Sequence, residues 1–247
     1  MADTLDFSGK TVLVVGGSSG IGNGIAQAFQ RNGAEVHVWG TRPRAEDYAG
    51  EEGSDLSQLV YAQMDVSDFA AVEAYTPAFA KLDVLVNCQG IVIYKRGEFA
   101  MDGFRRVIDV NLNSVMATAM RFRAMLSASR GSIINIASTS AYHTTVGNPA
   151  YGTSKAACVA LTRNLAAELG PVAGPGVAAV LDRDGDVVEV DGAGHRAMMV
   201  RRPQHCRSAC SGTWPQGGGE PCANGDGRSA ALGCAPWSGH GGSTTSC

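Results

Sequence analysis

Short apolar runs without polar alternation recur in the first two thirds of the chain, and helical segments lie between them. The first two runs read TVLVVG at 11–16 and AEVHVWG at 34–40. Such runs are typical of strands covered on both faces. Further strands are expected at 59–65, 83–90 and 131–138. Strands alternating with helices predict an α/β fold, a doubly wound parallel sheet that binds ligands at the carboxyl ends of its strands.

Four helices are expected between these strands. They cover 22–33, ended by Gly33; 66–82, with Ser67 as N-cap; Phe104 to about Met125; and Ala150 to Leu169. Apolar residues recur at helical spacing at the first helix, and they form the apolar face of the third. They are Ile21, Ile25, Ala28 and Phe29 in the first, and Val107, Val110, Leu112, Val115, Met116 and Met120 in the third.

The composition changes near Leu169. Of the 32 glycines, 16 lie in the last 78 residues, and between 195 and 247 only Val200 and Leu232 represent Leu, Ile, Val and Phe. Such a segment buries too little apolar surface to offset its ordering entropy. We therefore expect a folded, catalytic region at 1–169 and an atypical, poorly ordered or unusually packed segment at 170–247. A second hypothesis is out-of-frame translation of this segment, which lacks Ile, Phe and Lys.

Charge and hydropathy exclude several partners. The net charge of −3 gives no electrostatic basis for binding nucleic acid or an anionic membrane. No apolar run approaches the about 20 residues that span a bilayer, and the N-terminus lacks the features of a secretory signal. Cytoplasmic residence is expected. No metal site is predicted, because the cysteines and histidines between 195 and 247 lack paired C-x-x-C spacing.

A glycine-rich loop, GGSSGIG, joins the first strand to the first helix. Gly16 permits the tight turn, Gly20 lets the backbone approach a pyrophosphate, and Gly22 allows close packing of helix and strand. Free N–H groups and the positive end of the helix dipole then face the phosphates. An ordinary glycine-rich turn is the alternative. The candidate phosphate-binding residues are Gly16, Ser18, Ser19, Gly20, Ile21 and Gly22.

This loop resembles the T-G-x-x-x-G-x-G motif of the short-chain dehydrogenase/reductase family, with Val15 in place of Thr. The resemblance covers about residues 8–169 and implies a Rossmann fold. It further implies that Asp65 and Val66 flank the adenine. The family's N-N-A-G loop reads N-C-Q-G here, so Asn87 and Gly90 are retained, while Gln89 is larger than the usual Ala and lies near the ribose.

The residues at the end of the second expected strand indicate which dinucleotide is preferred. An acidic residue there would bind the ribose 2′-hydroxyl of NAD, but this chain has Gly40, Thr41 and Arg42. A guanidinium binds phosphate bidentately, so Thr41 and Arg42, with Arg44 near, favour NADP(H). NAD(H) is the alternative cofactor, in which case the arginines belong to a solvated loop.

Tyr151 and Lys155 lie four residues apart and therefore on one helix face. A free tyrosine is a poor acid at neutral pH, and a lysine cation one turn away favours the phenolate and can also hold the nicotinamide ribose. The resemblance implies that Ser138 polarises a substrate carbonyl and that Asn111 holds a water relaying protons to Lys155. Asn111, Ser138, Tyr151 and Lys155 are thus the expected catalytic set.

Together these features predict an NADP(H)-dependent oxidoreductase that interconverts a small-molecule ketone and a secondary alcohol, most like the 3-oxoacyl-(acyl carrier protein) reductase type. An NAD-dependent alcohol dehydrogenase is the first alternative. A non-catalytic dinucleotide-binding protein is the second, because the family pattern does not continue beyond Lys155. The resemblance implies a homo-oligomer, a dimer or tetramer built from helices around 100–128 and 150–169. The run at 176–181 is a candidate sixth strand, and 187–194 resembles the family's last strand.

Overall fold

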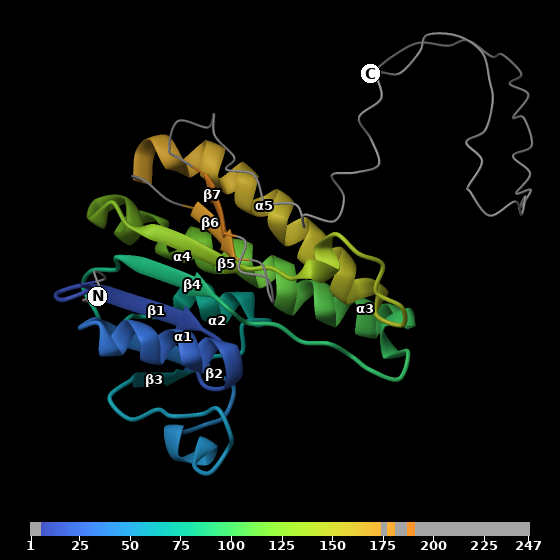
Figure 1. Cartoon of the computed structure of the whole chain (residues 1–247), viewed down its shortest axis with the longest axis horizontal. Coiled ribbons are helices and arrows are strands. Elements are labelled where there is room, and N and C mark those ends of the chain that lie inside the picture. Colours follow the sequence, from blue (N-terminus) through green and yellow to red (C-terminus); the bar gives the residue numbers. More distant parts are fainter. Residues whose placement is uncertain (1–5, 174–176, 181–186, 191–247) are drawn as a thin grey trace, which may run out of the picture. The chain divides into compact units, whose positions relative to one another are not determined.

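A computed structural model describes residues 6–173, 177–180 and 187–190. Their strands form one sheet in the order β3-β2-β1-β4-β5-β6-β7 (Figure 1). All neighbouring strands are parallel except β7, which is antiparallel to β6. The predicted doubly wound α/β sheet is thus confirmed. The strands are β1 (Thr11–Val15), β2 (Glu35–Gly40), β3 (Val60–Gln63), β4 (Val84–Asn87), β5 (Ser132–Ile136), β6 (Val177–Val180) and β7 (Val187–Val190).

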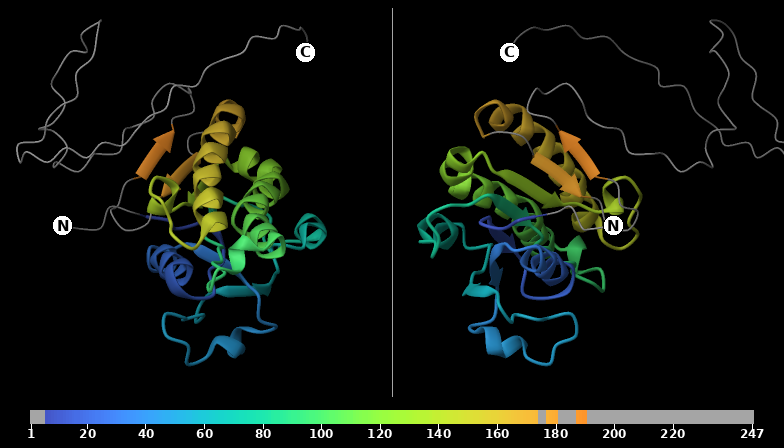
Figure 2. Two further views of the ribbon diagram at one scale, coloured as in Figure 1. Left: turned by 90° about the vertical axis from the view of Figure 1, so that its right-hand side faces the viewer. Right: turned by 60° about the vertical axis from the view of Figure 1, so that its left-hand side comes forward.

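Helices cover both faces of this sheet. They are α1 (Gly20–Arg31), α2 (Phe69–Ala74), α3 (Met101–Ile108), α4 (Ser114–Ser129) and α5 (Pro149–Ala173), and a π-helical turn, Asp109–Asn113, joins α3 to α4. Helix α1 packs on β1 and β2, whereas α4 and α5 pack on the opposite face, on β4, β5 and β6 (Figure 2). Short 3-10 helices lie at Ala45–Tyr48, Gly97–Phe99 and Thr139–Ala141.

Strand β1 supplies both layers of the core. Val12 and Val14 pack in the cluster that contains Ala26 of α1, while Leu13 and Val15 pack in the cluster on the other face. All four side chains are fully buried. Burial of such a side chain contributes about 1.5–3 kcal/mol. This explains why the strand shows no polar alternation.

Asp83 ties the start of β4 to β1. Its buried carboxylate accepts hydrogen bonds from the Thr11 N–H at 3.1 Å and from Lys10 Nζ at 3.1 Å, and it pairs with Lys81 Nζ at 2.7 Å. Burial alone would raise the pKa of Asp83, but the Lys81 ammonium, the Thr11 N–H and the Lys10 ammonium together hold it below its ordinary value.

The helix predicted at 66–82 is wrong in both its cap and its length. Asp68, not Ser67, is the N-cap, and its carboxylate accepts from the Ala71 N–H at 3.0 Å. Helix α2 ends at Ala74. Pro77 lies three residues further on and disfavours helical backbone at the residue before it.

The predicted helix over 104–125 is interrupted by the π turn. Val107, Val110 and Val115 are buried as expected, but Met116 is 40% exposed and Met120 36% exposed. A π turn holds more residues than an α turn, so the helical period of α3 does not continue into α4. The methionines therefore lie off the buried face.

The chain continues in regular structure beyond Leu169. Helix α5 runs to Ala173, and the candidate strand at 176–181 is confirmed as β6. The run at 187–194 contains β7. The rest of the 170–247 segment lies outside the described residues, with its cysteines and histidines, so the predicted domain boundary stays a prediction. Within the described part, no helix is long and apolar enough to cross a membrane.

Candidate active site

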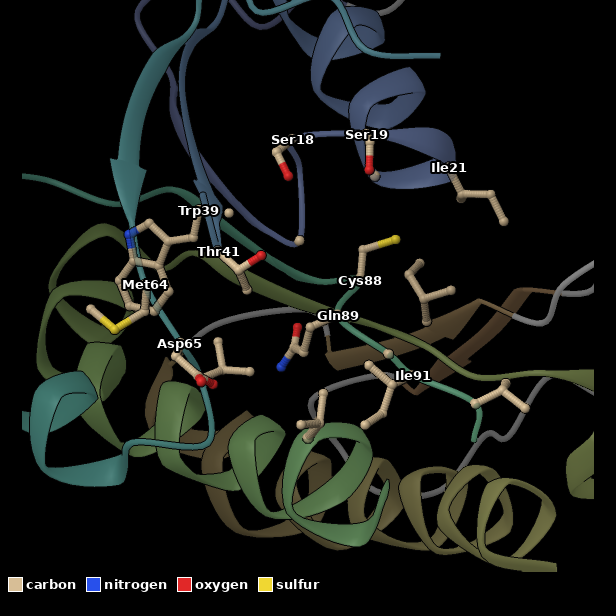
Figure 3. A pocket seen from close by; sticks show the side chains of 18 of the residues that line it. Ser18, Ser19, Ile21, Trp39, Thr41, Met64, Asp65, Cys88, Gln89 and Ile91 are labelled. Atoms are coloured by element: carbon tan, nitrogen blue, oxygen red, sulfur yellow. The ribbon is translucent and has the colours of Figure 1, made fainter. Parts of the chain in front are cut away.

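A pocket of about 660 Å³ lies beyond the carboxyl ends of β1, β2, β4 and β5 (Figure 3). The strand order reverses between β1 and β4, which is where doubly wound sheets bind ligands. Eleven residues predicted from the sequence line this pocket: Gly16, Ser18, Ser19, Ile21, Gly22, Thr41, Asp65, Val66, Gly90, Tyr151 and Lys155. Five predicted residues do not line it: Gly20, Arg42, Asn87, Asn111 and Ser138.

The glycine loop forms a cradle that side chains would fill. A Cβ on Gly16 would lie 2.9 Å from Gln89 Cα, and one on Gly22 would lie 2.1 Å from the Gly16 carbonyl oxygen. Gly16 also has a φ of +75°, which favours glycine. The first turn of α1 has neither an acidic residue nor a side-chain cap. This end of α1 therefore fits the pyrophosphate of a dinucleotide.

The end of β2 carries glycine, not an acidic residue, and side chains of its neighbours pack close to it. A Cβ on Gly40 would lie 2.6 Å from both Ser18 Oγ and Tyr48 Oη. Tyr48 Oη accepts hydrogen bonds from the N–H groups of Thr41 at 3.1 Å and Arg42 at 3.2 Å. Burial alone would raise the pKa of Tyr48, but its hydrogen bonds, that with Ser18 first, lower it on balance. The backbone conformation of the loop after β2 is thus held by hydrogen bonds to Tyr48.

The Arg42 guanidinium is held away from the pocket. It donates to the Asp47 carbonyl oxygen at 2.6 Å, pairs with the Glu51 carboxylate, and lies 4.3 Å from the Tyr48 ring centroid. Arg44 pairs with the Asp47 carboxylate at 3.1 Å. The sequence places both arginines near a phosphate site, but their side chains have partners within the loop itself.

Tyr151 and Lys155 lie on one face of α5, as predicted. Lys155 Nζ is 5.9 Å from the Tyr151 ring centroid and donates to the Ile136 carbonyl oxygen at 2.8 Å, and the lysine is only 5% exposed. Ser138 follows β5 and caps the 3-10 helix Thr139–Ala141, where its Oγ accepts from the Ser140 N–H at 3.1 Å. As an acceptor there, Ser138 keeps its own hydroxyl proton to donate.

Asn111 occupies the π turn and fixes the loop after β4. Its Oδ1 accepts from the Ile91 N–H at 2.8 Å, and its Nδ2 donates to the Ile91 carbonyl oxygen at 3.0 Å and to Ser154 Oγ at 3.2 Å. A Cβ on Gly90 would lie 3.6 Å from both Asn111 Oδ1 and Lys155 Nζ. Asn111 is therefore close to Lys155 although it does not line the pocket.

Asn87 has a structural position. Its side chain donates to Asn135 Oδ1 at 2.8 Å and accepts from Thr118 Oγ1 at 2.8 Å, which joins β4 to β5 and α4. Asp65, by contrast, lies exposed at the pocket, where hydrogen bonds from the Ser67 hydroxyl and N–H lower its pKa. Asp65 thus lines the pocket, whereas the Asn87 side chain joins elements of the fold.

Sequence reasoning missed Glu98. This carboxylate is 1% exposed and accepts from the N–H groups of Ile93 at 3.1 Å and Tyr151 at 3.0 Å, and from Asn148 Nδ2 at 3.3 Å. It joins the loop after β4 to the first turn of α5. No sequence signal marks it, because a single glutamate in a polar loop resembles a solvated one.

Comparison with known proteins agrees with this geometry. Residues 10–178 match the short chain dehydrogenase family. The chain belongs to the short-chain dehydrogenase family. It is 36% identical over 171 residues to the 3-oxoacyl-[acyl-carrier-protein] reductase FabG of Chlamydia pneumoniae, which covers 65% of this chain and 68% of the relative. It is also 36% identical over 178 residues to Momilactone A synthase of Oryza sativa subsp. japonica, which covers 68% and 64%.

The fold is similar to that of a solved structure from Beutenbergia cavernae, which has NADP bound at low occupancy. The TM-score is 0.62 and the identity 32%, over 72% of this chain and 73% of that one. A relative from Sphingomonas sp. (strain SKA58), 33% identical over 70% of both chains, is a 2-dehydro-3-deoxy-L-rhamnonate dehydrogenase (NAD(+)). The chain thus spans about two thirds of the length of its relatives, among which both dinucleotides occur.

Proposed function

We propose that the protein is an NADP(H)-dependent oxidoreductase that interconverts a ketone and a secondary alcohol. The observation that carries the proposal is that one pocket is lined by both the glycine cradle and the Tyr151–Lys155 pair. A bound nicotinamide dinucleotide supplies or accepts the hydride. The small-molecule substrate then lies at the Tyr151 end, beside the apolar side chains of Ile91 and Val92.

Each protein group has a defined part in carbonyl reduction. Tyr151 donates the proton to the carbonyl oxygen as hydride adds to the carbon, and the reverse reaction returns that proton to Tyr151. The Lys155 ammonium favours the resulting phenolate. Ser138 donates its hydroxyl proton in a hydrogen bond to the same oxygen and stabilises the developing charge. Asn111 positions the loop through Ile91.

The Tyr151→Phe variant tests the proposal. Reduction of a simple β-keto ester, followed by loss of NADPH absorbance, is expected to fall at least about 100-fold because general acid catalysis is removed. Tyr94→Phe is the matched control, because Tyr94 is 73% exposed and lies outside the pocket lining. Full activity in Tyr151→Phe would refute the mechanism. Dinucleotide binding without turnover of a broad carbonyl panel would favour the non-catalytic alternative.

The preference for NADP(H) is supported at the end of β2. Gly40 supplies no carboxylate, and Ser18 and Thr41 line the pocket there. An NAD(H)-dependent alcohol dehydrogenase is the second candidate, favoured by the pairing of Arg42 with Glu51. A 2′-phosphate would have to replace Glu51 as the partner of the Arg42 guanidinium.

Dissociation constants of NADPH and NADH, measured for wild type, Arg42→Ala and Glu51→Gln, separate these two candidates. Arg42→Ala should weaken NADPH binding about tenfold and leave NADH binding nearly unchanged, because a charge-assisted hydrogen bond is lost. Glu51→Gln should strengthen NADPH binding relative to NADH, because the guanidinium is released. An NADPH preference that is identical in wild type and both variants would remove Arg42 from the explanation.

We also propose a homo-oligomer, a dimer or tetramer, in the cytoplasm. The support is the partly exposed apolar surface of α4, where Met116 and Met120 lie. Light scattering of the full chain and of Met120→Glu tests this, and the substitution should lower the mass. An unchanged multimer would show that α4 is not the interface.

A further inference from the structure

The side-chain amide of Gln89 lies in the floor of the pocket, and only one of its two polar atoms has a hydrogen-bond partner among the described residues. The residue is 7% exposed, lines the pocket and lies two residues after the end of β4. Its Nε2 donates to Ser114 Oγ at 2.8 Å. Its Oε1 is buried and has no hydrogen-bond partner in the described part of the chain. A buried acceptor without a partner is unfavourable, so it marks a place where a ligand donor would be bound.

The orientation of this amide is set by Ser114. The Ser114 hydroxyl donates its single proton to the Val110 carbonyl oxygen at 2.6 Å. Its oxygen can therefore only accept from Gln89, which requires the Gln89 NH₂ group to face α4. The carbonyl oxygen is left on the pocket side, as Figure 3 shows. The pocket thus offers an acceptor, and its ligand partner must be a donor.

The position of Gln89 is also fixed. A Cβ on Gly16 would lie 2.9 Å from both Cα and N of Gln89, so the loop after β4 sits directly against the glycine loop. In Figure 3 the amide lies between Asp65 and Ile91. Because Asp65 is expected beside the adenine, we expect the amide to face the adenosine portion of a bound dinucleotide.

We propose that Gln89 Oε1 accepts a hydrogen bond from the adenosine portion of the dinucleotide. Two kinds of donor in that portion share the required chemistry: the 6-amino group of adenine and the free ribose hydroxyls, which are 2′ and 3′ in NAD(H) and 3′ alone in NADP(H). Phosphate oxygens do not qualify, because they only accept. The inference rests on the proposed function and adds a recognition residue to it. Gln89 is then a determinant of dinucleotide affinity rather than a group that takes part in hydride transfer.

Equilibrium binding to wild type and Gln89→Leu tests the inference. The probes are NADH and its 6-deamino, 2′-deoxy and 3′-deoxy adenosine analogues, titrated by fluorescence. Wild type should bind NADH about five- to tenfold more tightly than the analogue that lacks the partner of Gln89. Gln89→Leu should lose that ratio and keep the other two, because leucine fills similar space without an acceptor. The analogue whose affinity ratio is lost in Gln89→Leu identifies the donor group.

Two further variants sharpen the result. Cys88→Ala, a change at the preceding pocket residue, should keep the wild-type ratio even where absolute affinity changes. If Gln89→Leu does not fold, the same ratio of NADH affinity to analogue affinity is measured for Gln89→Met. Equal ratios in wild type and the Gln89 variants, with NADH still bound, would overturn the assignment of Gln89 alone. Failure of wild type to bind any dinucleotide would overturn both this inference and the proposed function.

Discussion

Replacing Glu98 is expected to destabilise the fold more than replacing an exposed glutamate. Its carboxylate holds three donors from two separate segments: the Ile93 N–H, the Tyr151 N–H and Asn148 Nδ2. The carboxylate also lies at the N-terminal turn of α5, where negative charge is favourable. Glu98→Gln keeps the shape and removes the charge, so it isolates the hydrogen bonds from the packing.

The size of the effect follows from these contacts. In Glu98→Gln an NH₂ group must face either Tyr151 N–H or the pair of donors on the other side, so at least one donor is left opposite another donor. Loss of one charge-assisted hydrogen bond costs about 2 kcal/mol. Glu98→Ala loses all three and leaves a cavity, for which we expect about 4 kcal/mol.

Urea unfolding followed by circular dichroism measures both values, as a lower midpoint at unchanged slope. Glu73→Gln is the matched control, because Glu73 is exposed on α2 and should change stability by less than about 0.5 kcal/mol. The turnover of Glu98→Gln should also fall while NADPH affinity is retained, since the NH₂ group is expected to face the single donor, the Tyr151 N–H, which then loses its partner. A Glu98→Gln midpoint equal to that of wild type would refute the argument.

Three further changes have defined outcomes. Gly22→Ala should unfold or strongly destabilise the protein in the same urea assay, whereas Gly24→Ala, whose Cβ meets open space on α1, should stabilise it by about 0.5–1 kcal/mol; equal effects would contradict the cradle. Because the folded pKa of Asp83 is lowered, its contribution is present above its ordinary value of 3.8 and lost as pH falls through the folded value. Asp83→Asn should therefore lower the unfolding midpoint at pH 7, and this deficit should shrink below about pH 3.8; a deficit independent of pH would be inconsistent. In peptide mapping after maleimide treatment, NADPH should protect Cys88, which lines the pocket, while Cys158, whose thiol pKa is raised by burial, should react slowly with or without it.

The sequence predicts those parts of the molecule that depend on local pattern. Strands buried on both faces leave unbroken apolar runs, and the cradle needs glycine at Gly16 and Gly22 because backbone atoms occupy the space of a side chain. The pairing of Tyr151 with Lys155 follows from helical spacing alone. These features require no knowledge of a distant partner.

Other features depend on contacts that spacing does not record. The π turn that holds Asn111 shifts the helical period, so the exposure of Met120 was predicted wrongly. Arg42 is directed by Glu51 and not by a phosphate. Glu98 is buried only because the loop after β4 folds onto α5. In each case the outcome is decided by tertiary packing.

The two helix N-termini near the pocket differ in what they leave for a ligand. At α5 the positive end of the dipole is already satisfied by the Glu98 carboxylate, while at α1 no acidic side chain or cap is present. Of these two helix ends, α1 therefore leaves its N–H groups to an anion, whereas the first turn of α5 already has a carboxylate partner. A bound dinucleotide is thus expected to place its pyrophosphate at α1, which fixes which half of the molecule lies toward Tyr151 and Lys155.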